Sequence, residues 1–434
     1  MESVDFYKEF GDLGYLANYS NHEFYEDGVF YKTAEHYYQA HKFDNPEVQK
    51  LIIDAKTPKE ASNIGRDRKY IRRSDIDSVK NQIMYHGVYL KFYQNKDIMY
   101  RLIETRRKPI REMTTKEYYW GVGPDLSGEN HMGKILVQVR EALKKQLLEK
   151  ILSKAKEQDM VYVIGHKRPD IDSIFSSYLL SNVLNHLGIN SRPCILNNGY
   201  EVVENDKAML KDYKTFDLEV LDSTNYSFIL VDHNHLDGLD KENVIGAIDH
   251  HMHTNEVDNV LEMEYASTGL LIYDLFKDVY PFSKEEKELI GLTVLTDTEY
   301  LTSSRFSEED ELLYDELGLE LDVSSLQKKY FKISDFSDFD QLLYSDYKEY
   351  DFEGEHINRS IIKSYTDEFN SYFETVKEHI KNKKGIWLVI WNNYESRETF
   401  AIFKGEVYRL DFFTTSTNLV LKYLKESKDV KKRT

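Results

Sequence analysis

Short runs of β-branched and other apolar residues alternate with helical patterns in the middle of the chain. Val161–Ile164, Phe228–Val231 and Val244–Ile248 have the pattern of buried strands, and Ile174–Leu187 that of a helix. Glu285–Leu295 has the pattern of a later helix. Strands that alternate with helices in this way predict a parallel sheet flanked by helices.

The patterns before and after this segment differ from it. Ala34–Phe43, Val79–Tyr93 and Gly133–Ile151 place apolar or aromatic residues at helical spacing, and the third is long, amphipathic and rich in Lys and Glu. Asp351–Ile362 and Ile386–Trp391 are strand-like. They indicate a smaller α/β lobe at the end of the chain.

The length and composition of the chain indicate that it has more than one domain. At 434 residues, the chain exceeds the size of one domain, and its 41% of hydrophobic residues suffices for packed cores. We predict a mainly helical α+β domain over 1–148, a helical linker over 149–158, a parallel-sheet domain over 159–320 and a smaller α/β lobe over 321–434.

The charge and the cysteine usage narrow the class of protein. The 57 basic and 76 acidic residues give a net charge of -19, without a basic stripe, which argues against a nucleic-acid nuclease. Cys194 is the only cysteine, so an internal disulfide framework is excluded. Neither a signal peptide nor an apolar run of about 18 residues is present. We expect a soluble cytoplasmic protein with no membrane partner.

Asp and His residues follow three of the predicted strands. The runs are His166-Lys-Arg-Pro-Asp170-Ile-Asp172-Ser173, Asp232-His233-Asn234 and Asp249-His250-His251. A plain strand–turn–helix with a capping Asp172 explains one carboxylate, but it leaves His166 and Asp170 unexplained. Because ligands gather at the carboxyl ends of parallel strands, the three runs together predict one metal site.

The ligand types indicate which metals suit this site. Carboxylates and imidazoles without thiolate favour Mn²⁺, Mg²⁺ or Co²⁺, and Zn²⁺ is less favoured. The supply of ligands is large enough for two ions that share a carboxylate. Such a pair would lower the pKa of a bridging water and aim it at phosphorus.

On these residues the chain resembles the DHH phosphoesterases, most closely the manganese-dependent family II inorganic pyrophosphatases, over about residues 158 to 425. The matching motifs are Gly165–Ser173, Val231–Asn234, Asp249–His251 and Thr296–Thr298. The resemblance implies two Mn²⁺ ions with the ligands His166, Asp170, Asp172, Asp232, His250 and Asp297, of which Asp232 bridges. It also implies that His251 contacts the phosphate and supplies a proton. His233, beside the bridging ligand, and Lys348 complete the substrate-binding set.

One segment departs from that family. Its pyrophosphatases end with a Ser-Arg-Lys motif that clamps the second phosphate, whereas Asp411–Thr417 has no Arg-Lys pair. Loss of these cations would weaken the binding of a compact tetra-anion. The expected reaction is therefore hydrolysis of a phosphoanhydride or phosphoester, with free pyrophosphate as only one candidate substrate.

The first 140 residues carry a second candidate site. Glu35 follows the short strand Gly28–Tyr31 and opens an aromatic helix, and Trp120 lies in a glycine-bearing turn. On pattern alone, a glutamate that favours the helix dipole and a tryptophan that fills a core explain these features better than catalysis does.

This region resembles the NADAR family over nearly its full length. The matching segments are Leu16–Tyr19, Thr33–Phe43, Ile64–Arg66, Lys91–Asn95, Trp120–Gly123 and Gly128–Lys134. The resemblance implies an N-glycosidase of nucleotide-like substrates, either riboflavin-pathway intermediates or ADP-ribosylated guanine. Glu35 would polarise the bond or a water, and Trp120 would stack on the base. Arg66, Asn130 and Lys134 would bind the substrate, and Glu117 replaces a family Asp.

We therefore predict a bifunctional hydrolase that acts on a small-molecule phosphate or nucleotide. ADP-ribosylated nucleic acid is a further candidate partner, and a homodimer is left open. In the alternative, a non-catalytic NADAR domain senses ADP-ribose or a nucleotide and regulates a DHH phosphohydrolase. Glu117 and the missing Arg-Lys pair keep this alternative open.

Overall fold

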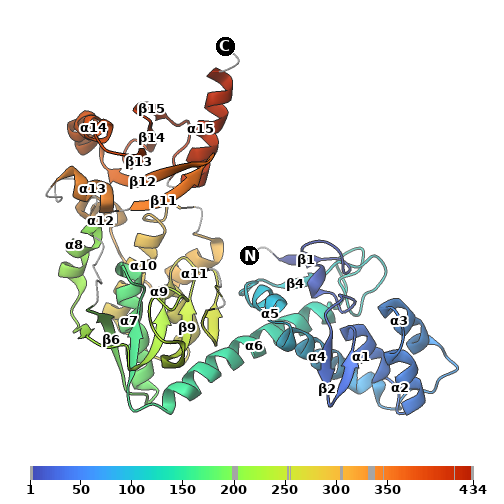
Figure 1. The fold of residues 1–434 in the computed structure, drawn as a ribbon. Helices are drawn as coiled ribbons and strands as arrows, with labels where there is room; N and C mark the ends of the chain where they lie inside the picture. The colour runs from blue at the N-terminus through green and yellow to red at the C-terminus, as the bar shows by residue number, and fades with distance from the viewer. Residues whose placement is uncertain are drawn as a thin grey trace. The chain divides into compact units, whose positions relative to one another are not determined.

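The computed structural model describes residues 3–197, 204–251, 254, 256–303, 306–330, 338–345, 347–414 and 416–431. They form two compact units (Figure 1). The first comprises residues 1–159 with 233–236 and 244–264, and the second comprises 160–232, 237–243 and 265–434. The segment 244–264 groups with the first unit because its strands pack against the end of the long helix that precedes residue 157.

The first unit is mainly helical, as predicted for this region. Its helices are α1 (Ala34–Ala40), α2 (Pro46–Ile53), α3 (Pro58–Arg66), α4 (Ile76–Gln94), α5 (Lys96–Ile103) and α6 (His131–Lys156), with a 3-10 turn at Gly14–Leu16. Two small sheets accompany them. β1 (Val4–Phe6) pairs in parallel with β4 (Ile110–Glu112), and β2 (Phe24–Glu26) pairs antiparallel with β3 (Val29–Tyr31).

Local sequence explains the entry into α1. Asp27 and Gly28 both have positive φ, as the two-residue turn of a tight hairpin requires. β3 then leads to Thr33, whose side chain accepts a hydrogen bond from the backbone N–H of His36 and caps α1. The helix that begins after Thr33 therefore carries Glu35 in its first turn.

Helix α6 runs through the predicted linker without a break. The sequence predicted a helix from Gly133 to Ile151, and α6 extends it at both ends (Figure 1). Its buried positions, which include Leu136, Leu143 and Ile151, recur along one side. Near the end of α6, Gly246 of β9 lies so close to Ile151 that a β-carbon at this glycine would stand 2.9 Å from the Ile151 side chain.

The predicted parallel sheet is confirmed and has six strands. They are β5 (Val161–Ile164), β6 (Ser191–Leu196), β7 (Glu219–Leu221), β8 (Ser227–Val231), β9 (Val244–Asp249) and β10 (Val260–Glu262), in the order β10-β9-β8-β5-β6-β7. The chain proceeds from β5 to one side and from β8 to the other. The carboxyl ends of β5 and β8 thus form the point where ligands bind in open α/β sheets.

Helices cover this sheet and connect it to the rest of the second unit. They are α7 (Ile171–His186), α8 (Glu204–Tyr213), α9 (Thr268–Phe276), α10 (Lys284–Asp297), α11 (Glu308–Glu316), α12 (Val323–Tyr330) and α13 (Phe339–Ser345), with a 3-10 turn at Lys241–Asn243. α7 packs on β5, β6 and β8, and α9 and α10 pack on α7.

The predicted C-terminal lobe is a five-stranded sheet between two helices. Its strands β11 (Tyr347–Phe352), β12 (Glu355–Ser364), β13 (Ile386–Asn393), β14 (Glu398–Phe403) and β15 (Glu406–Arg409) are adjacent in chain order. Side chains of β13 alternate between the faces: Val389 packs against α14 (Thr366–Lys381), and Ile390 packs against α15 (Thr417–Lys431).

The strand-like range Asp351–Ile362 covers the end of one strand and most of the next. β11 ends at Phe352, and β12 begins at Glu355. Glu353 and Gly354 both have positive φ and form a tight turn between the two strands. The strand pattern continued across the turn because the turn has only two residues.

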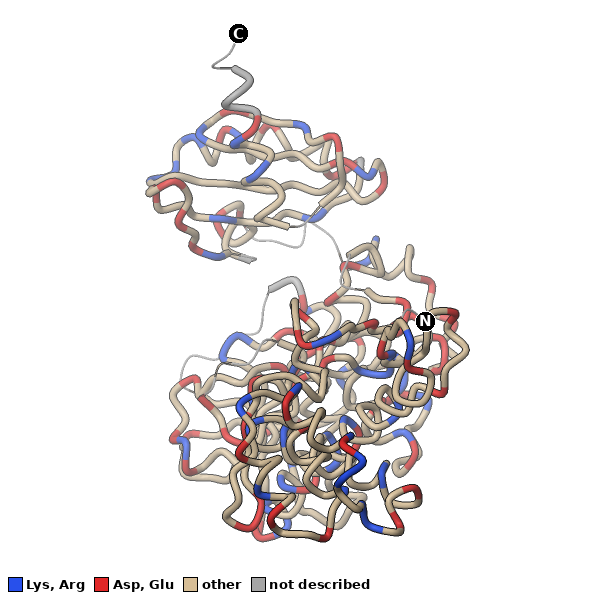
Figure 2. The backbone as a smooth tube through the Cα atoms, turned by 90° about the vertical axis from the view of Figure 1, so that its right-hand side faces the viewer, with Lys and Arg blue, Asp and Glu red and all other residues tan. Residues whose placement is uncertain are grey.

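Charge and hydropathy add two observations. Figure 2 shows Lys and Arg positions interspersed with Asp and Glu positions around the backbone. Within the described ranges, no helix combines the length and the apolar character that crossing a bilayer requires.

Candidate active sites

The first unit contains a cavity of about 260 Å³ that is lined by several residues predicted for the site. Glu35, Arg66, Glu117 and Trp120 all line it. Three segments that are distant in sequence thus meet around one small space, and they bring carboxylates, a cation and an aromatic surface together.

Both oxygens of the buried Glu35 carboxylate accept hydrogen bonds. Asn18 Nδ2 donates to Oε2 over 2.5 Å, and Gln39 Nε2 donates to Oε1 over 2.7 Å. Burial raises the pKa of Glu35, while the hydrogen bond from Gln39 acts in the opposite direction. The carboxylate is therefore held in one orientation at the wall of the cavity.

A second layer of contacts orients Gln39. Lys42 Nζ donates to Gln39 Oε1 over 2.7 Å and to the Gly65 carbonyl over 2.9 Å, which turns the amide nitrogen of Gln39 toward Glu35. Burial lowers the pKa of Lys42 to about 8. A β-carbon at residue 65 would stand 2.0 Å from Gln39 Oε1, so this close approach requires glycine. Within the Ile64–Arg66 segment, Gly65 therefore has a structural role, because it leaves room for the Gln39 side chain.

Trp120 forms an aromatic wall of the cavity. Its ring meets that of Tyr38 edge-to-face at 5.4 Å and that of Tyr119 edge-to-face at 5.1 Å. Tyr38 also lines the cavity. Edge-to-face packing holds the indole in place and leaves it available as a surface for a planar ligand.

Sequence reasoning missed two carboxylates of this cavity, Glu9 and Glu112. Glu112 lies at the end of β4. Burial, together with the smaller effects of the charges of Glu117 and Glu35, raises the pKa of Glu112 to about 7. A strand of three residues has no periodic pattern that could have indicated this position.

Two predicted substrate-binding residues lie elsewhere in the first unit. Asn130 bonds to the backbone of β4, because its Nδ2 donates to the Ile110 carbonyl over 2.8 Å and its Oδ1 accepts from the Glu112 N–H over 3.1 Å. Lys134 lines a separate surface groove with Tyr85 and His131. The structure therefore groups Arg66 with Glu35, but neither Asn130 nor Lys134 is among the described residues of that cavity.

The predicted metal ligands meet at the carboxyl ends of β5 and β8. His166 Nε2 lies 3.5 Å from an oxygen of Asp170 and 3.4 Å from an oxygen of Asp232. Burial lowers the pKa of His166, but the two carboxylates outweigh it and raise the value to about 11. A cation at this position would have to displace that proton.

A second group of ligand atoms shares Asp232. Potential ligand atoms of Asp172, Asp232, His250 and Asp297 all lie within 4.8 Å of one another, as do those of His166, Asp170 and Asp232. Asp297 is the last residue of α10, and Asp172 lies in the first turn of α7. The six predicted ligands thus form two groups that have Asp232 in common.

Local backbone geometry positions these carboxylates. Asp170 caps α7 by accepting from the Ser173 N–H over 3.0 Å, and Ser173 Oγ donates to Asp232 over 2.7 Å. Asp172 accepts from the N–H groups of Thr268 and Gly269 at the start of α9. A β-carbon at Gly165 would stand 2.6 Å from Ser173 Cβ, so glycine is required where β5 approaches α7.

Adjacent residues of the Asp249-His250-His251 run have different surroundings. Asp249 is fully buried and accepts from Asn234 Nδ2 over 2.6 Å and from His251 Nδ1 over 2.9 Å. His251 is half-exposed, and the bond to Asp249 directs its Nε2 away from that carboxylate. His233, next to Asp232 in the chain, is buried.

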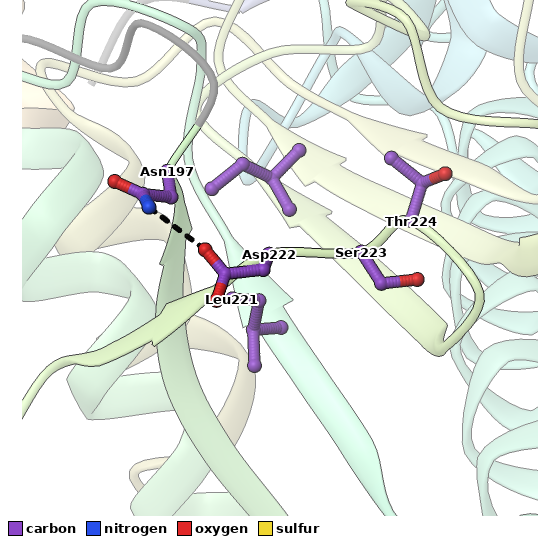
Figure 3. Close-up of a pocket in the computed structure, with 6 residues that line it drawn as sticks. Asn197, Leu221, Asp222, Ser223 and Thr224 are labelled. Atoms are coloured by element: carbon purple, nitrogen blue, oxygen red, sulfur yellow. Dashed lines mark hydrogen bonds between the residues drawn. The ribbon is translucent and has the colours of Figure 1, made fainter.

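The remaining candidates lie outside the ligand group. Lys348 is exposed on β11, opposite Arg359 on β12. In the segment that lacks the Arg-Lys pair, Phe413 packs under the guanidinium of Arg397 at 4.2 Å. A further hollow at the ends of β6 and β7 contains Asn197, whose amide donates to Asp222 (Figure 3).

The donor set of the ligand group fits a divalent cation. It has four carboxylates and two imidazoles and no thiolate, which suits hard or borderline cations. Further bonds support the ligands, as metal sites require, since Ser173 holds Asp232 and α9 holds Asp172.

Comparison with known proteins finds a different family match for each of two segments of the chain. A family model for the NADAR domain matches residues 5–144, and a model for the N-terminal domain of the DHH family matches residues 160–297. N-glycosidase Npun_R5314 of Nostoc punctiforme is 36% identical over 148 residues, which are 33% of this chain and 95% of that protein. N-glycosidase YbiA of Escherichia coli is 33% identical over 140 residues, which are 32% of this chain and 88% of that protein.

A solved structure resembles the second half. A proposed family II inorganic pyrophosphatase from Methanococcus jannaschii is 21% identical, with 56% of this chain and 86% of that chain covered at a TM-score of 0.44. A score below 0.5 does not establish a common fold, so the assignment of this half depends on the family model. The chain belongs to the NADAR family through residues 5–144 and contains the N-terminal domain of the DHH family over residues 160–297.

Proposed function

We propose that the chain is a bifunctional hydrolase, with an N-glycosidase in residues 5–144 and a metal-dependent phosphohydrolase in the segment that begins with the DHH match at residue 160. The observation that carries the first activity is the buried, doubly hydrogen-bonded Glu35 in a cavity walled by Trp120. The names of the relatives, both N-glycosidases, support it.

The residues of the first cavity suit a nucleotide-like substrate. Trp120 offers a stacking surface for a base, and Arg66 offers a cation for a phosphate. Asn18 and Gln39 hold the Glu35 carboxylate where it can stabilise an oxocarbenium-like carbon or accept a proton from an attacking water. The reaction would release a base from a ribose-containing substrate.

Substitution of Glu35 tests this activity. Glu35→Gln is expected to reduce the rate of base release by about 100-fold or more, because the amide can neither accept the proton nor carry the charge. The measurement is chromatographic detection of free base from ADP-ribosylated guanine and from nucleotides. Release at the wild-type rate would contradict the assignment, and calorimetric binding of ADP-ribose without any release would favour a sensing domain.

For the ligand groups around Asp232 we propose a pair of Mn²⁺ ions that share this residue. His166 and Asp170 would complete one position, and Asp172, His250 and Asp297 the other. When bound, such ions would polarise a phosphoryl oxygen and lower the pKa of a water. In this proposal His251, whose Nδ1 bonds to Asp249, would use its second ring nitrogen to exchange a proton with a phosphate oxygen.

The missing Arg-Lys pair favours a substrate other than free pyrophosphate. The test is a comparison of pyrophosphate, ADP-ribose and nucleotide monophosphates with the Mn²⁺-loaded chain, with phosphate release as the measurement. Asp232→Asn should abolish release on every substrate, because this side chain belongs to both ligand groups. Unchanged turnover in that variant would contradict the two-metal assignment.

A further inference from the structure

Hydrogen bonds hold the backbone of Glu112 at both its N–H and its carbonyl. Its N–H donates to Asn130 Oδ1 over 3.1 Å, and its carbonyl accepts from the Val122 N–H over 2.9 Å. Gly133 makes room for this arrangement, since a β-carbon there would stand 2.0 Å from the Ile110 carbonyl and 2.5 Å from Asn130 Nδ2. These bonds fix the backbone of Glu112, and its side chain lines the cavity.

Four glutamates line this cavity, namely Glu9, Glu35, Glu112 and Glu117, and like charges around one cavity raise the cost of ionising all of them. Glu35 accepts hydrogen bonds at both oxygens, which favours its ionised form. In the described part of the chain, no side chain donates a hydrogen bond to the carboxylate of Glu112. Burial raises the pKa of both carboxyls, and side-chain hydrogen bonds oppose that rise only at Glu35. These hydrogen bonds are thus the difference that favours a negative charge on Glu35 and a proton on Glu112.

We infer that Glu112 is the general acid of the first site and protonates the departing base while Glu35 receives the proton of the attacking water. The inference depends on the N-glycosidase activity proposed above. In the balanced step, the bond between the ribose C1 and the base nitrogen breaks, and its electron pair goes to the nitrogen. That nitrogen takes the proton of Glu112, water adds to C1, and its proton passes to Glu35. A transfer of one proton through solvent restores both groups.

Two probes with the same ADP-ribose part and different leaving groups test this role. Guanine attached through nitrogen needs a proton to leave, whereas 4-nitrophenolate does not. On ADP-ribosylated guanine, Glu112→Gln is expected to lower kcat by about 100-fold or more. On 4-nitrophenyl ADP-ribose, the same variant should keep a kcat close to that of the wild type, while Glu35→Gln should be impaired on both probes.

The pH profile gives a second measurement. The wild-type kcat on the guanine probe should fall as the pH rises above about 7, because the acid loses its proton. This decline should be absent in Glu112→Gln. In Glu117→Gln it should move to lower pH, because one of the charges that raise the pKa of Glu112 is removed. Glu47→Gln, an exposed position on α2, serves as the matched control and should follow the wild type.

The outcomes separate the inference from the proposed function. An equal loss on both probes would mean that Glu112 only supports the structure, and a wild-type rate on the guanine probe would mean that it is dispensable. Either result overturns the inference while the N-glycosidase assignment stands. Failure of the wild-type chain to release a leaving group from either probe overturns the assignment and the inference together.

Discussion

The two carboxylates Glu35 and Glu112 show how single contacts decide the behaviour of identical side chains. Both line one cavity, but two amide donors surround Glu35, and only backbone contacts are described for Glu112. Burial raises the pKa of both carboxyls, but only at Glu35 do side-chain hydrogen bonds oppose that rise. The orientation of Glu35 depends in turn on Gly65. Because Gly65 has no side chain, Gln39 has room to reach Glu35.

Replacement of Gly65 by alanine tests that dependence. A β-carbon 2.0 Å from Gln39 Oε1 must displace the amide. Gly65→Ala is therefore expected to lower the free energy of unfolding by about 1–3 kcal/mol and to slow base release, because Glu35 loses an oriented donor. Thermal unfolding and kcat are the measurements. Asn63→Ala, an exposed position on the same helix, is the control, and equal behaviour of the two variants would argue against the role of Gly65.

The raised pKa of Glu112 also predicts how stability depends on pH. The folded chain binds a proton at Glu112 up to about pH 7, whereas the unfolded chain releases it near the ordinary value of 4.5. This group therefore stabilises the fold below about pH 4.5, and its contribution is lost as the pH rises toward 7. Glu112→Gln should gain thermal stability relative to the wild type between pH 5 and pH 8. A constant difference over that range would contradict the prediction.

At the scale of elements, the polar residues of the NADAR motifs mainly connect segments. Lys91 Nζ on α4 donates to the carbonyls of Tyr15 and Ala17, next to Asn18, and Gln94 bonds to the backbone of Tyr25 on β2. Asn130 connects the start of α6 to β4 in the same way. These contacts hold together the elements that carry Glu35, Glu112 and Trp120, the residues of the proposed site.

The junction between β5 and α7 has the corresponding role in the second unit. Gly165→Ala would push Ser173 away from the end of β5, because a β-carbon would stand 2.6 Å from Ser173 Cβ. Since Ser173 holds Asp232, Mn²⁺ affinity is expected to fall by about 10- to 100-fold. Calorimetric titration with Mn²⁺ measures this effect. Arg192→Ala, on the exposed face of β6, should bind Mn²⁺ like the wild type.

At the scale of the whole molecule, one chain combines two sites of different chemistry. The first cavity uses carboxylates and an aromatic wall, and the second site brings together six potential metal ligands. The two activities should therefore respond differently to the same treatment, although the chain is continuous through α6.

Removal of metal from the full-length chain tests this independence. EDTA is expected to abolish phosphate release and to leave base release unchanged, and added Mn²⁺ should restore the former. Asp232→Asn should reproduce the effect of EDTA without recovery on addition of Mn²⁺. Loss of base release in EDTA would show that the first site also needs a metal or that the two sites are coupled.

From the sequence alone, local periodicity predicted the sheet and the long helix, and the rule that parallel strands end at one edge predicted one metal site. The individual ligands, such as Asp297 at the end of a helix, came from the resemblance to the DHH phosphoesterases. The tertiary structure decided the composition of the first cavity. Glu112 lies on a strand of three residues, and Asn18 and Gln39 reach Glu35 from different segments. It also placed Asn130 and Lys134 outside that cavity. Such contacts join positions far apart in the chain, and no local pattern records which of them will meet.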